Sequence, residues 1–281
     1  MTAFARRRTP RRRALRAGTT VLLLTATALT AGPAAAGGPA AGGGNGEKPT
    51  VVLVHGAFAD ASGWNDVIER LQRDGYEVVA PANPLRGLRN DSTYLASVLR
   101  SIEGPIVLVG HSYGGAVISG AAAGNPRVKA LVYVAAFMPD KGESLAELSA
   151  KFAGSELDAA LRPVPYTDAN GSGTDLYIRN DRFHDVFAAD LPRERTGVMA
   201  AAQRPAAAAG FAEKATAAAW KTIPSWFLVA RQDKAIAPDL ERFEARRAKS
   251  RTVEIDSSHV AMMSHPDAVT RLIRQAAKTT R

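Results

Sequence analysis

The chain contains no cysteine, so neither a disulfide bond nor a thiol nucleophile is available to it. It also has no His-Glu-x-x-His pair, no cluster of histidines and carboxylates at metal-ligand spacing, and no Gly-x-x-x-x-Gly-Lys phosphate loop. We therefore expect no bound metal and no cofactor. The stability of the fold must come from a packed apolar core, for which 281 residues are sufficient.

Negative charge is missing from the N-terminal segment. Residues 1–36 contain neither Asp, Glu nor Lys, but seven arginines lie between positions 6 and 16. These arginines account for most of the net charge of +9 and leave about +2 for the rest of the chain. Because the net charge of the remaining chain is close to zero, we expect no broad basic surface for a polyanion and no nucleic-acid partner.

The N-terminal segment also lacks a long apolar run. Its apolar stretch, Val21 to Leu29, is too short for a comfortable membrane span and is followed by Ala34-Ala35-Ala36. An arginine-rich start, a short apolar stretch and an A-x-A site predict a signal peptide over residues 1–36, cleaved after Ala36. The product would be secreted, by the Sec or the twin-arginine route, with no stable membrane anchor after cleavage. A transit peptide or an uncleaved anchor is the alternative.

Short apolar strands alternate with amphipathic helices in the rest of the chain. Residues 37–48 are rich in glycine and alanine and predict a flexible leader to a folded domain over 49–281. This alternation predicts an α/β fold, with a mostly parallel sheet covered by helices on both faces. The expected strands are 50–54, 77–80, 106–109, 129–136, 225–229 and 252–255, and the expected helices are 63–74, 92–102, 116–123, 238–248 and 266–277.

The alternation is interrupted between about 139 and 222, a segment rich in helix formers and turn residues. We interpret this segment as an inserted, mainly helical cap between two strands of the sheet. Its alanine-rich part, 200–219, predicts an amphipathic helix of small residues. At the helix expected over 92–102, Asp91 or Ser92 is the predicted N-cap.

The candidate nucleophile is Ser112. It lies in Gly110-His111-Ser112-Tyr113-Gly114, directly after the apolar run of residues 105–109 and before a helix-prone stretch. A buried strand, Gly-x-Ser-x-Gly and a helix form a nucleophile elbow, in which glycines make room for a strained serine with a projecting hydroxyl. The alternative is a serine without a catalytic role in a glycine-rich turn.

The base should be a histidine on a loop at the carboxyl end of a late strand, because the ligands of open parallel sheets bind at that edge. His259 meets this condition, since it lies four residues beyond the expected end of the last strand. For the other histidines we expect other roles: His265 starts a helix, His184 lies in the cap, and His55 and His111 occupy motifs where backbone geometry matters more than imidazole chemistry.

The acid that orients this histidine should lie between the serine and the histidine in the chain. Asp233 follows the strand expected over 225–229, which places it at the same edge of the sheet. Asp140 follows an earlier strand, and Asp239 opens a helix, where a carboxylate has a role of its own.

An oxyanion hole needs two backbone N–H groups. We assign one to Tyr113, after the elbow, and the other to Ala57 in preference to Phe58, on the loop after the first strand. Phe58 and the side chain of Tyr113 are expected to line an apolar pocket together with parts of the cap. Trp64 is assigned to the core.

Five segments of the chain are similar to those of a known protein family. VVLVHGAFADASGW (51–64), VLVGHSYGGAVI (107–118), ALVYVAAFMPDKGES (130–144), SWFLVARQDKAIAPDLERF (225–243) and SSHVAMMSHPDAV (257–269) resemble the α/β-hydrolase superfamily. Within it they are similar to the branch of plant-type methylesterases, hydroxynitrile lyases and small bacterial serine esterases. The resemblance implies a triad of Ser112, Asp233 and His259, the same two oxyanion donors, and a cap over the pocket.

The lyases of that branch carry threonine at the position of Gly56 and lysine directly after the catalytic histidine, where this chain has Val260. These departures favour ester hydrolysis. The sequence thus predicts a secreted, metal-independent serine esterase whose partner is a small, largely apolar ester. A cofactor-free lyase or perhydrolase with the same triad, or a non-catalytic binder of a small ligand, is the alternative.

Overall fold

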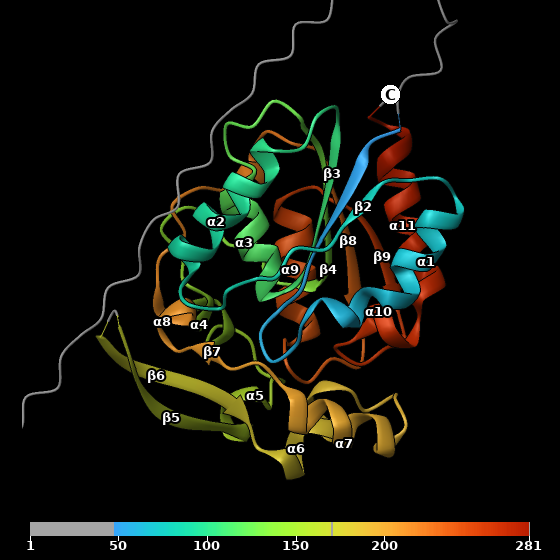
Figure 1. Ribbon diagram of the computed structural model, residues 1–281. Helices are drawn as coiled ribbons and strands as arrows, with labels where there is room; N and C mark the ends of the chain where they lie inside the picture. The colour runs from blue at the N-terminus through green and yellow to red at the C-terminus, as the bar shows by residue number, and fades with distance from the viewer. Residues whose placement is uncertain (1–47, 170, 281) are drawn as a thin grey trace, which may run out of the picture. The chain divides into compact units, whose positions relative to one another are not determined.

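A six-stranded parallel sheet is the centre of the computed structural model, which describes residues 48–169 and 171–280 (Figure 1). The strand order is β2-β1-β3-β4-β8-β9, and every neighbouring pair is parallel. The predicted fold class is thereby confirmed. The predicted signal peptide over 1–36, and all but the last residue of the predicted leader, lie outside the described residues. The strands are β1 (Thr50–Val54), β2 (Val78–Val79), β3 (Ile106–Ser112), β4 (Val128–Ala136), β8 (Ser225–Ala230) and β9 (Arg251–Ile255).

The central strands are apolar on both faces, as expected for a sheet that is covered twice. All residues of β1 and β3 are buried. Their register pairs Val54 with Gly110, and β4 continues beside β3 so that Ser112 pairs with Ala136. The parallel register therefore brings the loops that follow β1, β3, β4, β8 and β9 to one edge of the sheet.

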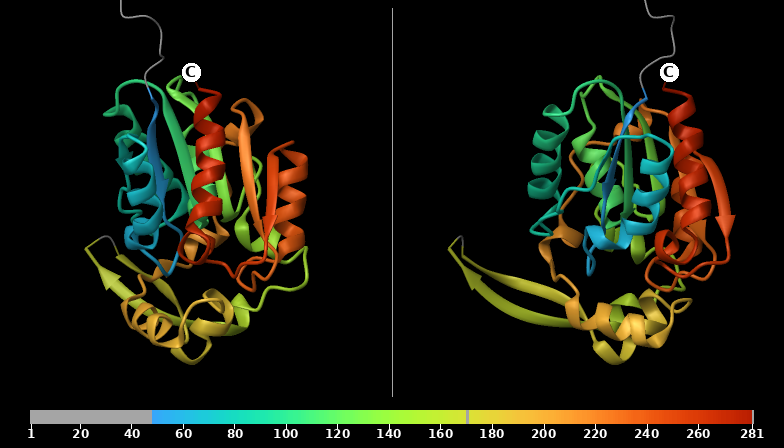
Figure 2. Two further views of the ribbon diagram at one scale, coloured as in Figure 1. Left: turned by 90° about the vertical axis from the view of Figure 1, so that its right-hand side faces the viewer. Right: turned by 45° about the vertical axis from the view of Figure 1, so that its right-hand side comes forward.

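Helices cover the two faces of this sheet (Figures 1 and 2). One face carries α1 (Asn65–Arg73) and α11 (Pro266–Lys278), and the other carries α2 (Leu88–Arg100), α3 (Tyr113–Ala121) and α9 (Pro238–Arg247). Within the part of the chain that the structure describes, no helix is both long and apolar enough to cross a membrane.

Helix α2 begins four residues earlier than predicted, and its N-cap is Gly87. Asp91 is therefore not a cap but a fully buried residue inside the helix. Its carboxylate accepts hydrogen bonds from the backbone N–H of Arg86 (3.1 Å) and the hydroxyl of Tyr113 (2.8 Å). The sequence predicted an N-cap because Asp near the start of a helix usually caps it. Here Asp91 instead accepts a hydrogen bond from the buried hydroxyl of Tyr113.

The segment between β4 and β8 lies across the carboxyl edge of the sheet (Figures 1 and 2). It contains the expected helices and also a three-stranded antiparallel sheet, β5-β6-β7, that was not predicted. Prolines in β5 and glycines in β6 conceal the hairpin from a search for alternating apolar residues. The cap elements are α4 (Leu145–Ser149), α5 (Leu157–Ala160), β5 (Leu161–Asp168), β6 (Gly171–Ile178), α6 (Asn180–Phe187), α7 (Arg193–Ala202), β7 (Ala206–Ala207), α8 (Ala209–Ala212) and η2 (Ala219–Lys221).

The prediction of one helix over the alanine-rich residues 200–219 is wrong. Helix α7 ends at Ala202, and the chain then forms β7, α8 and η2. The Gln203 side chain accepts from the N–H of Ile178 (2.8 Å) and donates to its carbonyl (2.8 Å), so it ties the chain to β6. Pro205 has no N–H to continue a helix. Tertiary pairing therefore overrides the helix propensity of alanine.

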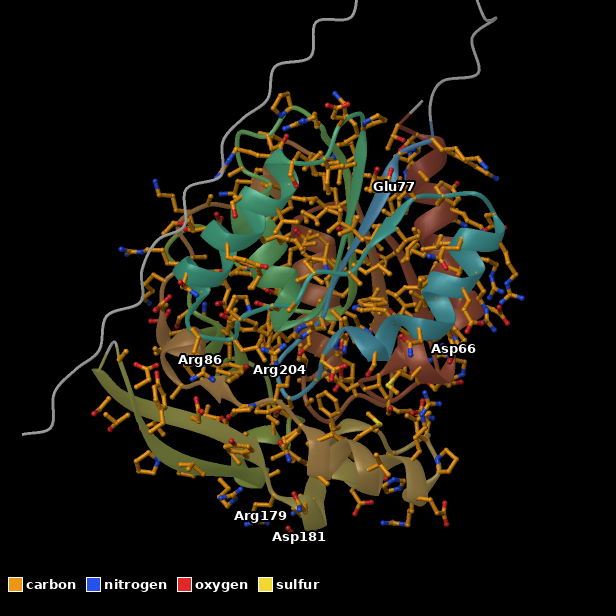
Figure 3. All side chains as sticks on the ribbon, in the orientation of Figure 1. Asp66, Glu77, Arg86, Arg179, Asp181 and Arg204 are labelled. Atoms are coloured by element: carbon orange, nitrogen blue, oxygen red, sulfur yellow. The ribbon has the colours of Figure 1, made fainter. Side chains whose placement is uncertain are left out.

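One arginine joins the hairpin to the body of the fold. Arg86, labelled in Figure 3, precedes α2 and reaches the cap. Its Nη1 donates to Asp175 Oδ1 in β6 (2.8 Å), and its guanidinium lies 5.2 Å from the ring centroid of Tyr166 in β5.

Candidate active site

Ser112 occupies a strained turn between β3 and α3. Its φ of 53° and ψ of −127° lie in a region that non-glycine residues rarely adopt. The strain is made possible by the two glycines of the motif: a Cβ at Gly110 would lie 2.6 Å from the carbonyl oxygen of Gly114, and one at Gly114 would lie 2.7 Å from that of Val54. This is the geometry of a nucleophile elbow.

The loop after β1 passes directly beside Ser112. A Cβ placed on Gly56 would lie 2.6 Å from the Cβ of Ser112, so only glycine allows the two segments to approach this closely. The next residue is Ala57, and Tyr113 opens α3, where its N–H has no carbonyl within the helix to bind. Both predicted oxyanion donors are therefore on segments adjacent to Ser112.

His259 and Asp233 form a buried hydrogen-bonded pair. His259 Nδ1 lies 2.5 Å from Asp233 Oδ2, and the two residues are 1% and 3% exposed. The other oxygen of Asp233 accepts from the N–H groups of Ala235 (2.7 Å) and Ile236 (2.9 Å). These bonds fix the carboxylate, and with Nδ1 donating to it, Nε2 of His259 remains free to act as a base.

The alternative acids and bases are engaged elsewhere. Asp140 forms an ion pair with Lys221 (2.6 Å), and Asp239 lies in the first turn of α9 and pairs with Arg242 (3.0 Å). His265 is the N-cap residue of α11, as predicted. His184 Nδ1 lies 3.1 Å from the hydroxyl of Thr196 in the cap.

His111 does more than the sequence suggested. Its ring is fully buried, and Nε2 donates to the carbonyl oxygen of His259 (2.9 Å), with ring centroids 4.6 Å apart. Burial and the neighbouring His259 hold the pKa of His111 well below its ordinary value, so its imidazole is neutral. The residue next to the candidate nucleophile is thus bonded to the backbone of the candidate base. The Ser112 hydroxyl itself makes no hydrogen bond within the described residues, and Ser112 is 7% exposed.

His55 likewise uses its imidazole, contrary to prediction. Nδ1 donates to the carbonyl of Gly56 (2.9 Å), while Nε2 accepts from the N–H of Asn83 (2.9 Å). Burial lowers the pKa of His55, which keeps this neutral tautomer. The sequence could not show these roles, because Asn83 and His259, whose backbone groups these two rings bind, are distant from them in the chain.

A second buried carboxyl group lies beside Asp233. Glu241, in the first turn of α9, is fully buried; its Oε2 accepts from the N–H of Ala230 (2.9 Å), whereas Oε1 has no donor among the described residues. Burial, followed by the charge of Asp233 and a hydrogen bond to it, raises the pKa of Glu241 well above its ordinary range. In its neutral form Glu241 has an O–H donor for the neighbouring carboxylate of Asp233.

The cap holds the loop that carries His259. Asp190, between α6 and α7, accepts from the backbone N–H of Ser258 (2.9 Å), from the Ser258 hydroxyl, and from the hydroxyl of Ser257 (3.2 Å). The ring of Phe187, at the end of α6, lies 5.0 Å from the ring of His259. The position of the cap and the position of the imidazole are therefore coupled.

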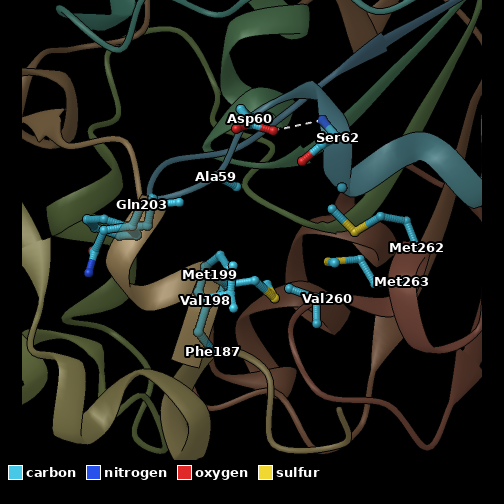
Figure 4. Close-up of a pocket in the computed structure, with 13 residues that line it drawn as sticks. Ala59, Asp60, Ser62, Phe187, Val198, Met199, Gln203, Val260, Met262 and Met263 are labelled. Atoms are coloured by element: carbon cyan, nitrogen blue, oxygen red, sulfur yellow. Dashed lines mark hydrogen bonds between the residues drawn. The ribbon is translucent and has the colours of Figure 1, made fainter. Parts of the chain in front are cut away.

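An apolar cavity of about 140 Å³ opens beside these groups (Figure 4). Phe58 lines it, as predicted. Tyr113 does not line it, because its side chain is 1% exposed and its hydroxyl is bonded to Asp91. Two aromatic rings and three thioethers contribute to the wall. Figure 4 labels Phe187, Val198, Met199, Val260, Met262 and Met263, and also Ala59 and the polar residues Asp60, Ser62 and Gln203. Trp64 is fully buried in the core, as predicted.

Over the described residues, no three His, Asp or Glu side chains are grouped so that they could hold a metal ion. Ser112 in its strained turn, the buried His259–Asp233 pair and the nearby backbone N–H groups form an arrangement suited to nucleophilic acyl transfer.

Residues 51–272 match the α/β hydrolase family, and the chain belongs to this family. A carbendazim-hydrolysing esterase of Nocardioides sp. (strain SG-4G) is 36% identical over 143 residues, which cover 41% of this chain and 59% of that protein. A pyrethroid hydrolase of Sphingobium wenxiniae is 30% identical over 161 residues, 51% of this chain and 56% of that protein. Each match thus spans somewhat more than half of the relative's length.

Solved structures show the same fold. The crystal structure of polyneuridine aldehyde esterase superimposes with a TM-score of 0.71 over 82% of this chain and 99% of that chain, at 20% sequence identity. The predicted resemblance to this branch of the family is confirmed, because methylesterases of Arabidopsis thaliana also match the chain.

Proposed function

We propose that the protein is a serine hydrolase that cleaves carboxylic esters of small, largely apolar substrates. The observation that carries this proposal is the buried 2.5 Å contact between His259 and Asp233 at the same sheet edge as the strained Ser112. Family membership and the two hydrolases among the relatives support it. The apolar wall of the neighbouring cavity supports apolar substrates.

In this mechanism the hydroxyl of Ser112 attacks the ester carbonyl, and Nε2 of His259 takes its proton. The N–H groups of Ala57 and Tyr113 stabilise the negative charge that develops on the carbonyl oxygen. His259 then protonates the leaving alcohol, and water hydrolyses the acyl-enzyme by the same route. Asp233 orients the imidazole throughout.

A cyanohydrin-cleaving lyase is the weaker alternative. The lyases that this branch contains carry threonine where this chain has Gly56, and any Cβ there would collide with Ser112. The crowding at Gly56 therefore favours hydrolysis.

The test is Ser112→Ala measured on p-nitrophenyl acetate. We expect kcat to fall on the order of 10⁴-fold or more, because the covalent intermediate can no longer form. Ser97→Ala is the matched control, since the hydroxyl of Ser97 lies on the exposed side of α2 and donates only to a carbonyl of its own helix. Hydrolysis by Ser112→Ala at a rate near that of the control would rule out this mechanism.

We also propose that the protein is exported and that its signal is removed after Ala36. The support is the arginine-rich start, the short apolar stretch and the alanine triplet. Sequencing of the N-terminus of secreted material should begin at or within a few residues of Gly37. A start near Met1 would contradict this proposal.

A further inference from the structure

A second cavity, of about 70 Å³, is lined by residues of the cap and of the loops that follow β4 and β8. Two of its wall residues form backbone hydrogen bonds to residues of the candidate triad. The N–H of Phe137 donates to the carbonyl oxygen of Ser112 (3.1 Å), and the N–H of Ala235 donates to Asp233 (2.7 Å). This cavity therefore adjoins the Ser112 and Asp233 side of the site. Leu157, Leu161, Leu176 and Phe211 of the cap also line it, together with Ala146, Ser149, Ser155 and Asp158.

The first cavity, shown in Figure 4, adjoins the His259 side. Phe187 in its wall contacts the imidazole, with ring centroids 5.0 Å apart, and Val260 directly follows His259. Phe58, also in the wall, directly follows the oxyanion donor Ala57. The two cavities thus lie beside different members of the triad.

Two stacked aromatic rings stand between the cavities. Phe58 lines the first cavity and Phe211 lines the second, and their rings are stacked with centroids 6.4 Å apart. Since Phe58 follows Ala57, this partition lies next to the position where the carbonyl of an ester would bind. An ester whose carbonyl binds at this position can extend one of its two ends into the first cavity and the other end into the second cavity.

The chemistry of the reaction decides which end goes where. The oxygen of the leaving alcohol must be within reach of Nε2 of His259, because it receives its proton from there. The acyl carbon remains bonded to Ser112. The alcohol portion therefore extends toward the His259 side and the acyl portion toward the Ser112 and Asp233 side.

We propose that the cavity lined by Phe58, Phe187 and the methionines binds the alcohol portion, and that the cavity lined by Phe137 and Phe211 binds the acyl portion. The preferred substrates are then esters of a short aliphatic acid with a bulky apolar alcohol. This inference rests on the proposed esterase function and adds the direction in which the ester binds.

The sizes of the cavities set this preference. A volume of about 140 Å³ is close to that of an apolar cavity of about 150 Å³ that holds benzene. Met199, Met262 and Met263 add polarizable thioethers that adapt to an aromatic ring. The cavity of about 70 Å³ has half that volume and fits a short acyl chain.

A pair of isomeric esters tests the direction without changing size or composition. Benzyl acetate joins a short acid to a bulky alcohol, whereas methyl phenylacetate joins a bulky acid to methanol, and both leaving groups are ordinary alkanols. We expect kcat/KM for benzyl acetate to exceed that for methyl phenylacetate by about tenfold or more, the scale of discrimination by an apolar pocket. Equal values, or a preference for methyl phenylacetate, would overturn the assignment.

Two pocket-filling variants test which cavity binds the alcohol portion and which binds the acyl portion of the ester. Met199→Trp fills the first cavity and should lower the ratio of kcat/KM for benzyl acetate to that for ethyl acetate about tenfold. Leu176→Trp fills the second cavity and should instead lower the ratio of ethyl butyrate to ethyl acetate hydrolysis. The reverse pattern, or an equal loss on all esters by both folded variants, would contradict the assignment.

If the wild-type protein hydrolyses p-nitrophenyl acetate but shows no preference between the isomers, the direction is wrong and the esterase function stands. If it hydrolyses no ester, the function itself fails.

Discussion

Single atoms decide how closely the candidate catalytic groups approach one another. Ser112 can adopt a positive φ only because Gly110 and Gly114 leave space around it, and the loop after β1 can pass beside it only because residue 56 is glycine. The motif and its flanking strand were sufficient to predict the elbow. The sequence did not predict Glu241, because a glutamate in the first turn of a helix usually faces solvent.

Glu241 provides the prediction at this scale. Glu241→Gln keeps an acceptor for the N–H of Ala230 and a donor for Asp233, so kcat should stay within a few-fold of wild type. Glu241→Leu removes both groups, and kcat should fall on the order of tenfold or more with little change in KM, because the orientation of Asp233 is loosened.

The pH profile separates this role from a purely structural one. In the wild type, ionisation of Glu241 as pH rises through its raised pKa places a second negative charge beside Asp233 and removes the O–H donor. Activity should therefore fall on the alkaline side, and in Glu241→Gln this limb of the kcat profile should move to higher pH. An unchanged limb, or equal losses in the two variants, would contradict the assignment.

At the scale of elements, the strands and helices of the main sheet were predictable and the cap was not. The buried strands are continuous apolar runs, and the parallel register then brings the ends of β1, β3, β8 and β9 together. The hairpin β5–β6 has no such signal, since prolines and glycines break its pattern and its pairing depends on contacts distant in the chain. The start of α2 was misplaced for a similar reason, because Asp91 serves Tyr113 rather than the helix end.

The contact between Asp190 in the cap and the loop that carries His259 leads to a prediction about the position of the base. Asp190→Ala removes the acceptor of Ser257 and Ser258, and the loop that carries His259 should lose its fixed position. We expect kcat to fall on the order of tenfold, while reactivity toward a small ester and a large one falls equally. Asp185→Ala is the control, because that carboxylate is half-exposed on α6 and pairs only within the cap. A loss of the same size in both variants would show that the contact has no role in positioning.

For the whole molecule, buried carboxyl groups make stability depend on pH. Glu244 in α9 is fully buried, and its Oε1 accepts from the N–H of Met138 (2.8 Å). Burial raises the pKa of Glu244 to about 8, although Arg247 lies 3.5 Å away. Between the ordinary value of 4.5 and about 8, the folded protein holds a proton at Glu244 that the unfolded chain has lost. This group therefore lowers the free energy of unfolding as pH rises through that window.

Glu244→Gln should remove that dependence. Relative to wild type, the variant should gain stability between pH 5 and pH 8, by up to about 1.4 kcal/mol per pH unit, and no further above this range. Urea unfolding at both pH values measures the difference, with Glu69→Gln on the exposed face of α1 as the control. A stability difference between variant and wild type that is the same at every pH would contradict the assignment of this proton.

The central claim is that the hydroxyl at position 112 is the nucleophile of an esterase. The most direct measurement is mass spectrometry of the protein after reaction with a p-nitrophenyl phosphonate, followed by peptide mapping. We predict one phosphonyl group per chain, located on Ser112, together with complete loss of ester hydrolysis. Hydrolysis that persists after exhaustive treatment, or a label on any other residue, would contradict the account.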